Sequence, residues 1–133
     1  MDGRLKIIQS RTGYRFSIDA VLLSEFVSTR PGDVLVDLGT GCGIIPLILL
    51  LSRPVRFAVG LEIQETLAAQ ASRNARLNGF GDRLAVVLGD IRNPPLAPLS
   101  ADLVLCNPPY RRRDSGRINP DPERAAARHE ILV

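Results

Sequence analysis

The chain contains one histidine and two cysteines among its 133 residues. His129 has no second histidine beside it, and Cys42 and Cys106 do not have the spacing of metal ligands. The sequence therefore predicts no metal centre and no catalytic triad, and His129 is expected to be structural. Two unpaired cysteines fit a reducing compartment, so we expect a cytoplasmic protein.

Long hydrophobic runs are also absent. The N-terminus lacks the apolar core and the cleavage site of a signal peptide. The longest apolar run, around Ile44 to Leu51, is far too short to span a bilayer, so no membrane partner is expected. A length of 133 residues suits one domain with one core.

Charge is unevenly distributed along the chain. The formal net charge is only +3, but arginine dominates and gathers near both ends of the sequence. Clustered arginine favours a polyanionic partner such as nucleic acid, although an arginine-rich solvated surface is an open alternative. The arginines concerned are Arg4, Arg11, Arg15, Arg111, Arg112, Arg113, Arg117, Arg124 and Arg128.

Glycine is concentrated directly after one apolar run. Residues 34–38 predict a buried parallel strand. The glycines at 39, 41 and 43 predict a turn that a ligand can approach closely, and a buried helix follows from Ile44 to Leu51 with Pro46 in its first turn. Strand, glycine turn and helix together are the nucleotide-cofactor opening of a doubly wound α/β domain.

The spacing of this glycine loop suggests the type of cofactor. The pattern is G-x-G-x-G with Asp37 two residues ahead, whereas the dinucleotide fingerprint is G-x-G-x-x-G. It resembles the first motif of class I S-adenosylmethionine-dependent methyltransferases. The resemblance implies a cofactor site that includes Asp37, Gly39, Thr40, Gly41 and Gly43. A purely structural turn, or a NAD site with altered spacing, remains open.

Further elements complete a Rossmann-like, mostly parallel α/β sheet. Apolar residues at helical spacing, including Val21, Leu22 and Phe26, predict a helix at about 18–29, and Ser17 is a candidate N-cap. The other expected elements are strands at 4–9, 56–61, 84–88 and 101–106, a helix at 64–78 ended by Gly79, and an extended connector at 93–98.

Acidic residues follow the second and third core strands. Glu62 can accept hydrogen bonds from both ribose hydroxyls of a nucleoside, with Ile63 beside it, or it can simply favour a helix N-terminus. By the family resemblance, Asp90 meets the exocyclic amine of the cofactor's adenine, and Ile91 offers a backbone N–H and an apolar wall. The alternative for Asp90 is an ordinary turn residue.

The fourth core strand runs directly into Asn107-Pro108-Pro109-Tyr110. Two prolines fix the backbone and remove two donors, so the Pro108 carbonyl and the Asn107 amide oxygen can converge on one –NH₂ group. Such acceptors favour a pyramidal nitrogen and stabilise the positive charge that develops during methyl transfer. Tyr110 offers a flat face on which a base can stack. These four residues are the predicted catalytic residues.

This tetrapeptide resembles motif IV of the amino-group methyltransferases, which act on adenine N6, guanine N2 or glutamine. Two further stretches resemble one branch, the bacterial tRNA(Val) adenine-N6 methyltransferases. They are GRLKIIQ and GYRFSIDAVLL at 3–9 and 13–23, and SGR, PDPERA and ARHE between 115 and 130. The resemblance implies methylation of the adenine 3′ of the anticodon in tRNA.

The same branch implies roles for residues outside the core motifs. Arg15, Phe16 and Asp19 are candidates to cover the methionine end of the cofactor, although Phe16 also suits a core position. A run of arginines after the tetrapeptide is expected to bind phosphates of the RNA. The alternative is that these arginines are only solvated. That run consists of Arg111, Arg112, Arg113 and Arg117.

The chain departs from the family in its length. A class I methyltransferase has seven strands, and only four core strands fit before Val133. We therefore expect a fragment of one methyltransferase domain that lacks the C-terminal strands, with residues 1–30 covering the cofactor and 31–133 forming the core. The fourth strand would then lie at an exposed apolar edge. Release-factor glutamine methylation and a non-catalytic S-adenosylmethionine-binding module are the alternative functions.

Overall fold

A computed structural model describes residues 5–9, 18–98 and 100–107. Within them, helices and strands alternate as far as the third strand, and the fourth strand follows it through the predicted connector with no helix between. The elements are α1 (Ile18–Phe26), β1 (Val34–Leu38), α2 (Ile44–Ser52), β2 (Phe57–Glu62), α3 (Glu65–Leu77), β3 (Leu84–Leu88) and β4 (Leu103–Cys106).

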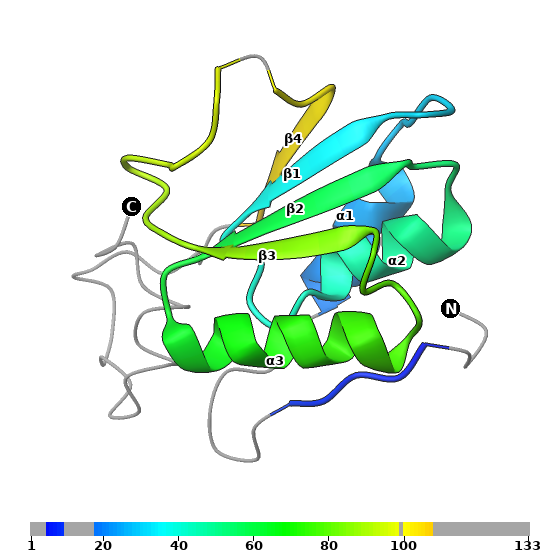
Figure 1. Ribbon diagram of the computed structural model, residues 1–133. Helices are drawn as coiled ribbons and strands as arrows, with labels where there is room; N and C mark the ends of the chain where they lie inside the picture. Colours follow the sequence, from blue (N-terminus) through cyan, green and yellow to red (C-terminus); the bar gives the residue numbers. More distant parts are fainter. Residues whose placement is uncertain (1–4, 10–17, 99, 108–133) are drawn as a thin grey trace.

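The four strands form one parallel sheet in the order β3-β2-β1-β4 (Figure 1). Strand β1 pairs with β2 on one side and with β4 on the other, so the chain reverses its direction of winding at β1. The predicted Rossmann-like fold is therefore confirmed. Ligands in open α/β sheets bind at such a switch point, outside the carboxyl ends of the strands.

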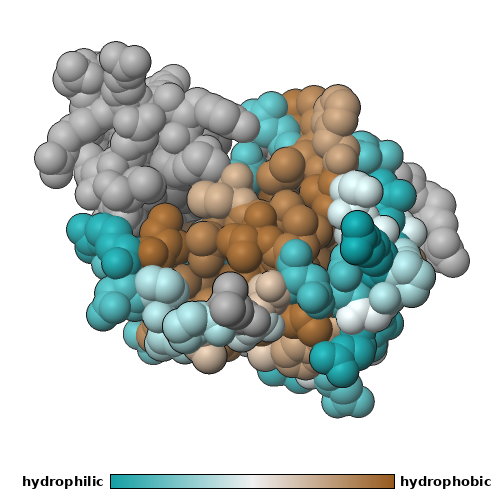
Figure 2. Space-filling view, turned by 90° about the horizontal axis from the view of Figure 1, so that it is seen from above, coloured by the Kyte–Doolittle hydropathy of each residue, from teal (hydrophilic) through white to brown (hydrophobic). Residues whose placement is uncertain are grey.

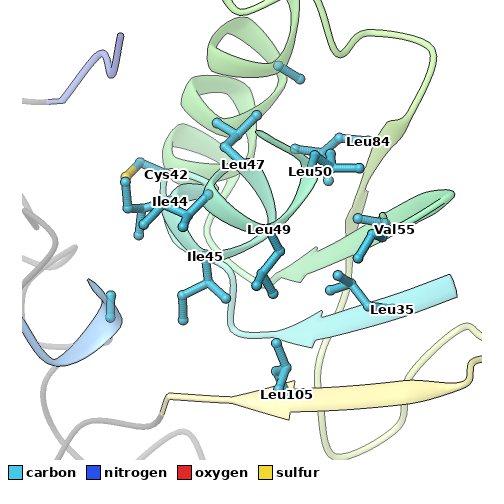
Figure 3. Close-up of a cluster of buried hydrophobic side chains, with 14 residues drawn as sticks. Leu35, Cys42, Ile44, Ile45, Leu47, Leu49, Leu50, Val55, Leu84 and Leu105 are labelled. Carbon is cyan, nitrogen blue, oxygen red and sulfur yellow. The ribbon is translucent and has the colours of Figure 1, made fainter. Parts of the chain in front are cut away.

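All three helices lie on one side of the sheet, below it in Figure 1. The hydrophobic core lies between them and that face. Figure 3 shows Leu35 of β1 and Leu105 of β4 pointing toward Ile45 and Leu49 of α2. Seven of the nine residues of α2 are buried, which explains why its sequence is apolar all round.

The second face of the sheet carries no described helix. Apolar residues gather in its centre, as Figure 2 shows. The connector between β3 and β4 crosses part of this face and borders a cavity of about 700 Å³. The cavity is lined chiefly by strand valines and connector residues, among them Val34, Val36, Val59, Pro95 and Leu96.

The N-terminal elements differ from the expectation in two respects. Residues 5–9 of the predicted first strand join no strand of the sheet and lie beside α3 instead (Figure 1). Helix α1 ends at Phe26, three residues before the predicted Thr29, and buries Ala20 and Ser24. Leu22 and Phe26 are 48% and 84% exposed, whereas Val21 and Leu23 pack partly against the core. Among the described residues, no helix is long and apolar enough to cross a membrane.

Candidate functional site

The loop between β1 and α2 is held by the end of β2. The backbone N–H groups of Gly39 and Thr40 both donate to the Leu61 carbonyl, at 2.8 and 2.9 Å. Gly39, Gly41 and Gly43 have φ values of 72°, 60° and 89°, a region that side chains with a Cβ disfavour. A Cβ at position 39 would meet nothing within 4 Å, so this part of the loop is open to a ligand.

Asp37 is buried at the end of β1, directly before this loop. Its Oδ2 accepts a hydrogen bond from the Thr40 hydroxyl at 2.7 Å. Its Oδ1 is buried and has no hydrogen-bond partner in the part of the chain that the structure describes. Burial raises the pKa of Asp37 to about 7; the hydrogen bond from Thr40 opposes this rise, and the charge of Glu62 adds to it.

Gly60 of β2 allows Thr40 to reach Asp37, a role that the sequence analysis did not assign. A Cβ at position 60 would lie 2.8 Å from Thr40 Cγ2, closer than real contacts permit. Without a side chain, β2 packs directly against the loop residue that orients the carboxylate. An isolated glycine within an apolar strand is a sequence indication of such a close approach.

Glu62 joins three elements at the end of β2. It is 5% exposed, and its Oε1 accepts the Gly41 N–H at 2.9 Å. Its Oε2 accepts the Gln64 N–H at 2.8 Å, at the N-terminus of α3. The structure thus supports the helix-terminal role of Glu62, and its ribose role stays a prediction.

Asp90 follows β3 and is engaged by a neighbour. The Arg92 side chain contacts both carboxylate oxygens, with its Nη2 2.5 Å from Oδ2. These hydrogen bonds lower the pKa of Asp90, so it is ionised at neutral pH. Ile91 beside it is half-buried, and Ile63 is 39% exposed at the end of β2. An amine that binds Asp90 would share the carboxylate with Arg92.

Asn107 directly follows β4, at the switch point of the sheet. The register pairs Leu38 of β1 with Cys106 of β4, so Asn107 and Gly39 leave adjacent strands at the same level. Asn107 is half-buried and is the last residue that the structure describes. The topology therefore brings the first residue of the tetrapeptide next to the glycine loop.

The remaining predicted site residues are distributed differently. Asp19 is half-buried in the first turn of α1. The others lie outside the described residues, so their roles stay predictions. They are Arg15, Phe16, Pro108, Pro109, Tyr110, Arg111, Arg112, Arg113, Arg117 and His129.

Neither cysteine contributes reactive chemistry to this site. Cys42 lies in the glycine loop, and burial raises the pKa of its thiol to about 11, so the thiol is protonated at neutral pH. The pKa of Cys106 is also raised, chiefly by desolvation. Within the described residues, no group of three or more histidine, cysteine or acidic side chains could hold a metal ion.

Comparison with known proteins identifies the family. The model of the methyltransferase small domain family matches residues 16–120. The chain belongs to this family. The match includes the glycine loop, Glu62, Asp90 and the tetrapeptide, and it confirms the family resemblance that these motifs predict.

Relatives within the methyltransferases support this placement. A Porphyromonas gingivalis protein named tRNA1(Val) (adenine(37)-N6)-methyltransferase is 34% identical, covering 96% of this chain and 52% of the relative. A Bacteroides thetaiotaomicron protein of the same name is 38% identical, covering 84% of this chain and 46% of the relative. The chain thus spans about half the length of these curated relatives.

A solved structure agrees on the fold. The crystal structure of a SAM-dependent methyltransferase from Geobacter sulfurreducens in complex with S-adenosyl-L-homocysteine superimposes with a TM-score of 0.58 at 22% identity. The match covers 68% of this chain and 36% of that chain. At this identity the similarity concerns the fold alone.

Proposed function

We propose that the protein is an S-adenosylmethionine-dependent methyltransferase that modifies the N6 amino group of adenine in tRNA. The observation that carries this proposal is the pairing of β1 with β4, which sets Asn107 beside the glycine loop. The family membership and the names of the relatives support the same activity and an RNA substrate. A tRNA-modifying role also favours the cytoplasm.

The described residues fit this cofactor. The loop is open at Gly39, Asp37 presents a buried carboxylate oxygen that lacks a partner among the described residues, and Glu62 lies beside the loop, where it accepts the Gly41 N–H. In this proposal Glu62 binds the ribose hydroxyls, while Asp37 faces the methionine end with Gly39, Thr40, Gly41 and Gly43.

Asp90 binds the adenine amine, and Ile63 and Ile91 form apolar walls. Phe16 and Asp19, within a covering segment formed by residues 1–30, close the methionine end over the core of residues 31–133.

The chemistry requires alignment and charge stabilisation. Bound S-adenosylmethionine supplies an electrophilic methyl group on a sulfonium. The amide oxygen of Asn107 and the carbonyl of Pro108 accept hydrogen bonds from the adenine N6 amino group and stabilise its developing positive charge. Tyr110, fixed by Pro109, stacks on the extruded base, a contact worth roughly 1–3 kcal/mol. No strong base is needed, because the methylated ammonium is acidic and loses its proton readily.

The RNA would be held electrostatically. Arginine side chains after the tetrapeptide are candidates to bind phosphates, and their contribution should fall as the salt concentration rises. They are Arg111, Arg112, Arg113 and Arg117. These contacts would position the RNA, whereas the tetrapeptide that begins at Asn107 would select the base.

Two measurements on this chain test the proposal. The first is calorimetric titration with S-adenosylhomocysteine, with NAD as the control ligand. The second is transfer of labelled methyl from S-adenosylmethionine to tRNA transcripts or to a release-factor peptide that contains glutamine. Saturable binding of S-adenosylhomocysteine alone, with label in tRNA N6-methyladenine, supports the proposal. Label in the peptide favours the glutamine methyltransferases instead.

A second candidate is a non-catalytic S-adenosylmethionine-binding module. Cofactor binding without methylation of either substrate would support this candidate for the present chain. Absence of cofactor binding by the folded chain would contradict both candidates.

The Asn107→Ala variant tests the role of the tetrapeptide. We expect the methyl-transfer rate to fall by about a hundredfold or more, because a preorganised hydrogen-bond acceptor is lost, while S-adenosylhomocysteine affinity changes little. The matched control is Asn93→Ala, at an exposed position in the connector. Near-normal transfer by Asn107→Ala would contradict the assigned chemistry.

A further inference from the structure

Residues 5–9, which we term the strap, pair with two asparagine side chains of α3. The Lys6 N–H donates to Asn78 Oδ1 at 2.8 Å, and Asn78 Nδ2 donates to the Lys6 carbonyl at 2.6 Å. Two residues on, the Ile8 N–H donates to Asn74 Oδ1 at 2.6 Å, and Asn74 Nδ2 donates to the Ile8 carbonyl at 3.1 Å. Each carboxamide thus bonds both the N–H and the carbonyl of one strap residue, as the backbone of a neighbouring strand would.

The spacing explains why the two pairs form together. Residues two apart in extended chain are about 6.6 Å apart, and residues four apart on a helix rise by about 6 Å. Asn74 and Asn78 therefore match Lys6 and Ile8 in register. The strap obtains its backbone partners from side chains, without belonging to the sheet.

The two asparagines differ in what else they contact. The second donor of Asn78 reaches the Asn74 carbonyl at 2.8 Å, within α3 itself. The second donor of Asn74 reaches the Cys42 carbonyl at 2.9 Å, in the middle of the glycine loop. Asn74 is 0% exposed, and both of its amide hydrogens are used. Only Asn74, of these two, joins the strap to the loop.

Helix α3 touches the loop at a second point near Asn74. A Cβ at Gly43 would lie 3.3 Å from Ala71 Cβ, one helical turn before Asn74. Ala71 itself is fully buried. The glycine loop therefore packs closely on this face of α3. A displacement of the Asn74 carboxamide would shift the loop.

We propose that Asn74 is a positioning residue that couples the strap to the glycine loop. Docking of the strap fixes the carboxamide in the orientation in which Nδ2 supports the Cys42 carbonyl, and so stabilises the loop conformation that receives the cofactor. That this coupling controls the affinity for the cofactor rests on the proposed function. Coupling between two sites is reciprocal, so a ligand on the loop should also stabilise the strap.

Amide hydrogen exchange on the full 133-residue chain, without any ligand, tests the coupling directly. We compare Asn74→Ala with the matched variant Asn78→Ala, which removes an equal pair of strap hydrogen bonds but no loop contact. Relative to amides of β2 and β3, exchange at residues 41–43 should rise at least tenfold in Asn74→Ala and less than twofold in Asn78→Ala. Equal effects of the two variants on the loop would overturn the proposal.

A second pair of variants leaves α3 intact, in case Asn74→Ala fails to fold. Ile8→Pro removes the N–H that pairs with Asn74, and Lys6→Pro removes the N–H that pairs with Asn78. We expect faster loop exchange in Ile8→Pro only. An unchanged loop in Ile8→Pro would show that the loop does not depend on the strap.

S-adenosylhomocysteine provides a further readout that a purely structural role of Asn74 would not alter. Its binding should slow hydrogen exchange of the Lys6 and Ile8 amides in the unmodified chain. In Asn74→Ala this protection should disappear, and the affinity for S-adenosylhomocysteine should fall about tenfold. Binding that leaves the strap amides unchanged would contradict the coupling. If the unmodified chain does not bind this ligand, the proposed function fails, whereas the ligand-free exchange comparison still decides the role of Asn74.

Discussion

Asp37 illustrates how one buried carboxyl group can link site chemistry to stability. Its pKa of about 7 lies well above the ordinary value of 3.8, because burial disfavours the charged form. The folded state therefore holds a proton that the unfolded chain releases between these two values. Since the native state binds more protons there, the free energy of unfolding should fall as pH rises from about 4 to 7.

The Asp37→Asn variant should remove this pH dependence, because an amide cannot ionise. In the unmodified chain, ionisation of Asp37 should lower the free energy of unfolding by up to about 1.4 kcal/mol per pH unit between about pH 4 and 7. Urea unfolding at pH 5 and pH 7.5 measures the difference. An unaltered decline in Asp37→Asn would contradict the assignment.

Gly60 gives a second prediction for a single residue. In Gly60→Ala the new methyl would lie 2.8 Å from Thr40 Cγ2, so Thr40 must move away from Asp37. Overpacking of this kind costs about 1–3 kcal/mol of unfolding free energy, and S-adenosylhomocysteine affinity should fall with it. Thermal unfolding and calorimetry provide the two measurements.

Gly81→Ala is the matched control for this substitution. Its Cβ would meet Arg76 Cγ at an ordinary 3.5 Å, so we expect a change within about 0.5 kcal/mol. Similar effects of the two variants would mean that the close approach of β2 to Thr40 is unimportant.

At the level of elements, Glu62 connects the end of β2 to the loop and to the N-terminus of α3. Its two oxygens accept from Gly41 and Gln64, which lie on different elements. The carboxylate thus satisfies a buried backbone donor of the loop while it complements the helix dipole of α3. A ligand that binds Glu62 is thereby oriented by both elements.

The Glu62→Gln variant should disturb this junction. A glutamine must turn its NH₂ toward one of the two backbone N–H groups, so one charge-assisted hydrogen bond worth about 1.5–3 kcal/mol is lost. We expect S-adenosylhomocysteine to bind at least tenfold more weakly by calorimetry. Glu65→Gln, exposed in the first turn of α3, is the control and should retain the affinity of the unmodified chain.

The sequence predicted the elements of the core because their residues repeat a clear pattern. Apolar runs bounded by glycine, proline or an acid located β1, β2 and β3 to within a residue, and the all-apolar run located α2. The family motifs placed Asp37, Glu62 and Asn107 at the carboxyl ends of the strands, where the structure has them.

Features that depend on tertiary contacts could not be predicted in this way. Residues 5–9 alternate like a strand, yet their partners are Asn74 and Asn78, more than sixty residues away. The most buried side chains of α1 are those of Ala20 and Ser24, although Phe26 is far more apolar and is exposed. The side chain that pairs with Asp90 lies only two residues on, at Arg92, but a turn conformation is needed to bring them together.

For the whole molecule, the main asymmetry is between the two faces of the sheet. The helices cover one face, and the second face has only the connector across part of it among the described residues. Val104 of β4 and Leu88 of β3 are 58% and 55% exposed. Exposed apolar edge strands favour association between chains.

We therefore expect the unmodified chain to self-associate with rising concentration, and Val104→Lys to reduce this association. A lysine on an apolar edge strand opposes edge-to-edge pairing. Light scattering coupled to size-exclusion chromatography measures the effect. Leu77→Lys, at an exposed apolar position on α3, should have no comparable effect, and equal behaviour of the two variants would contradict the role of the sheet.

The parallel pairing of β1 with β4 has a consequence for the order in which the protein folds. The Val34 N–H donates to an Asp102 carboxylate 68 residues later, whereas β1 and β2 are joined by a short crossover. Because closing a longer loop costs more chain entropy, β1, α2 and β2 can assemble before β4 arrives. The glycine loop and Glu62, which are proposed to bind the methyl donor, would then be placed early, and Asn107 would join them as one of the last steps.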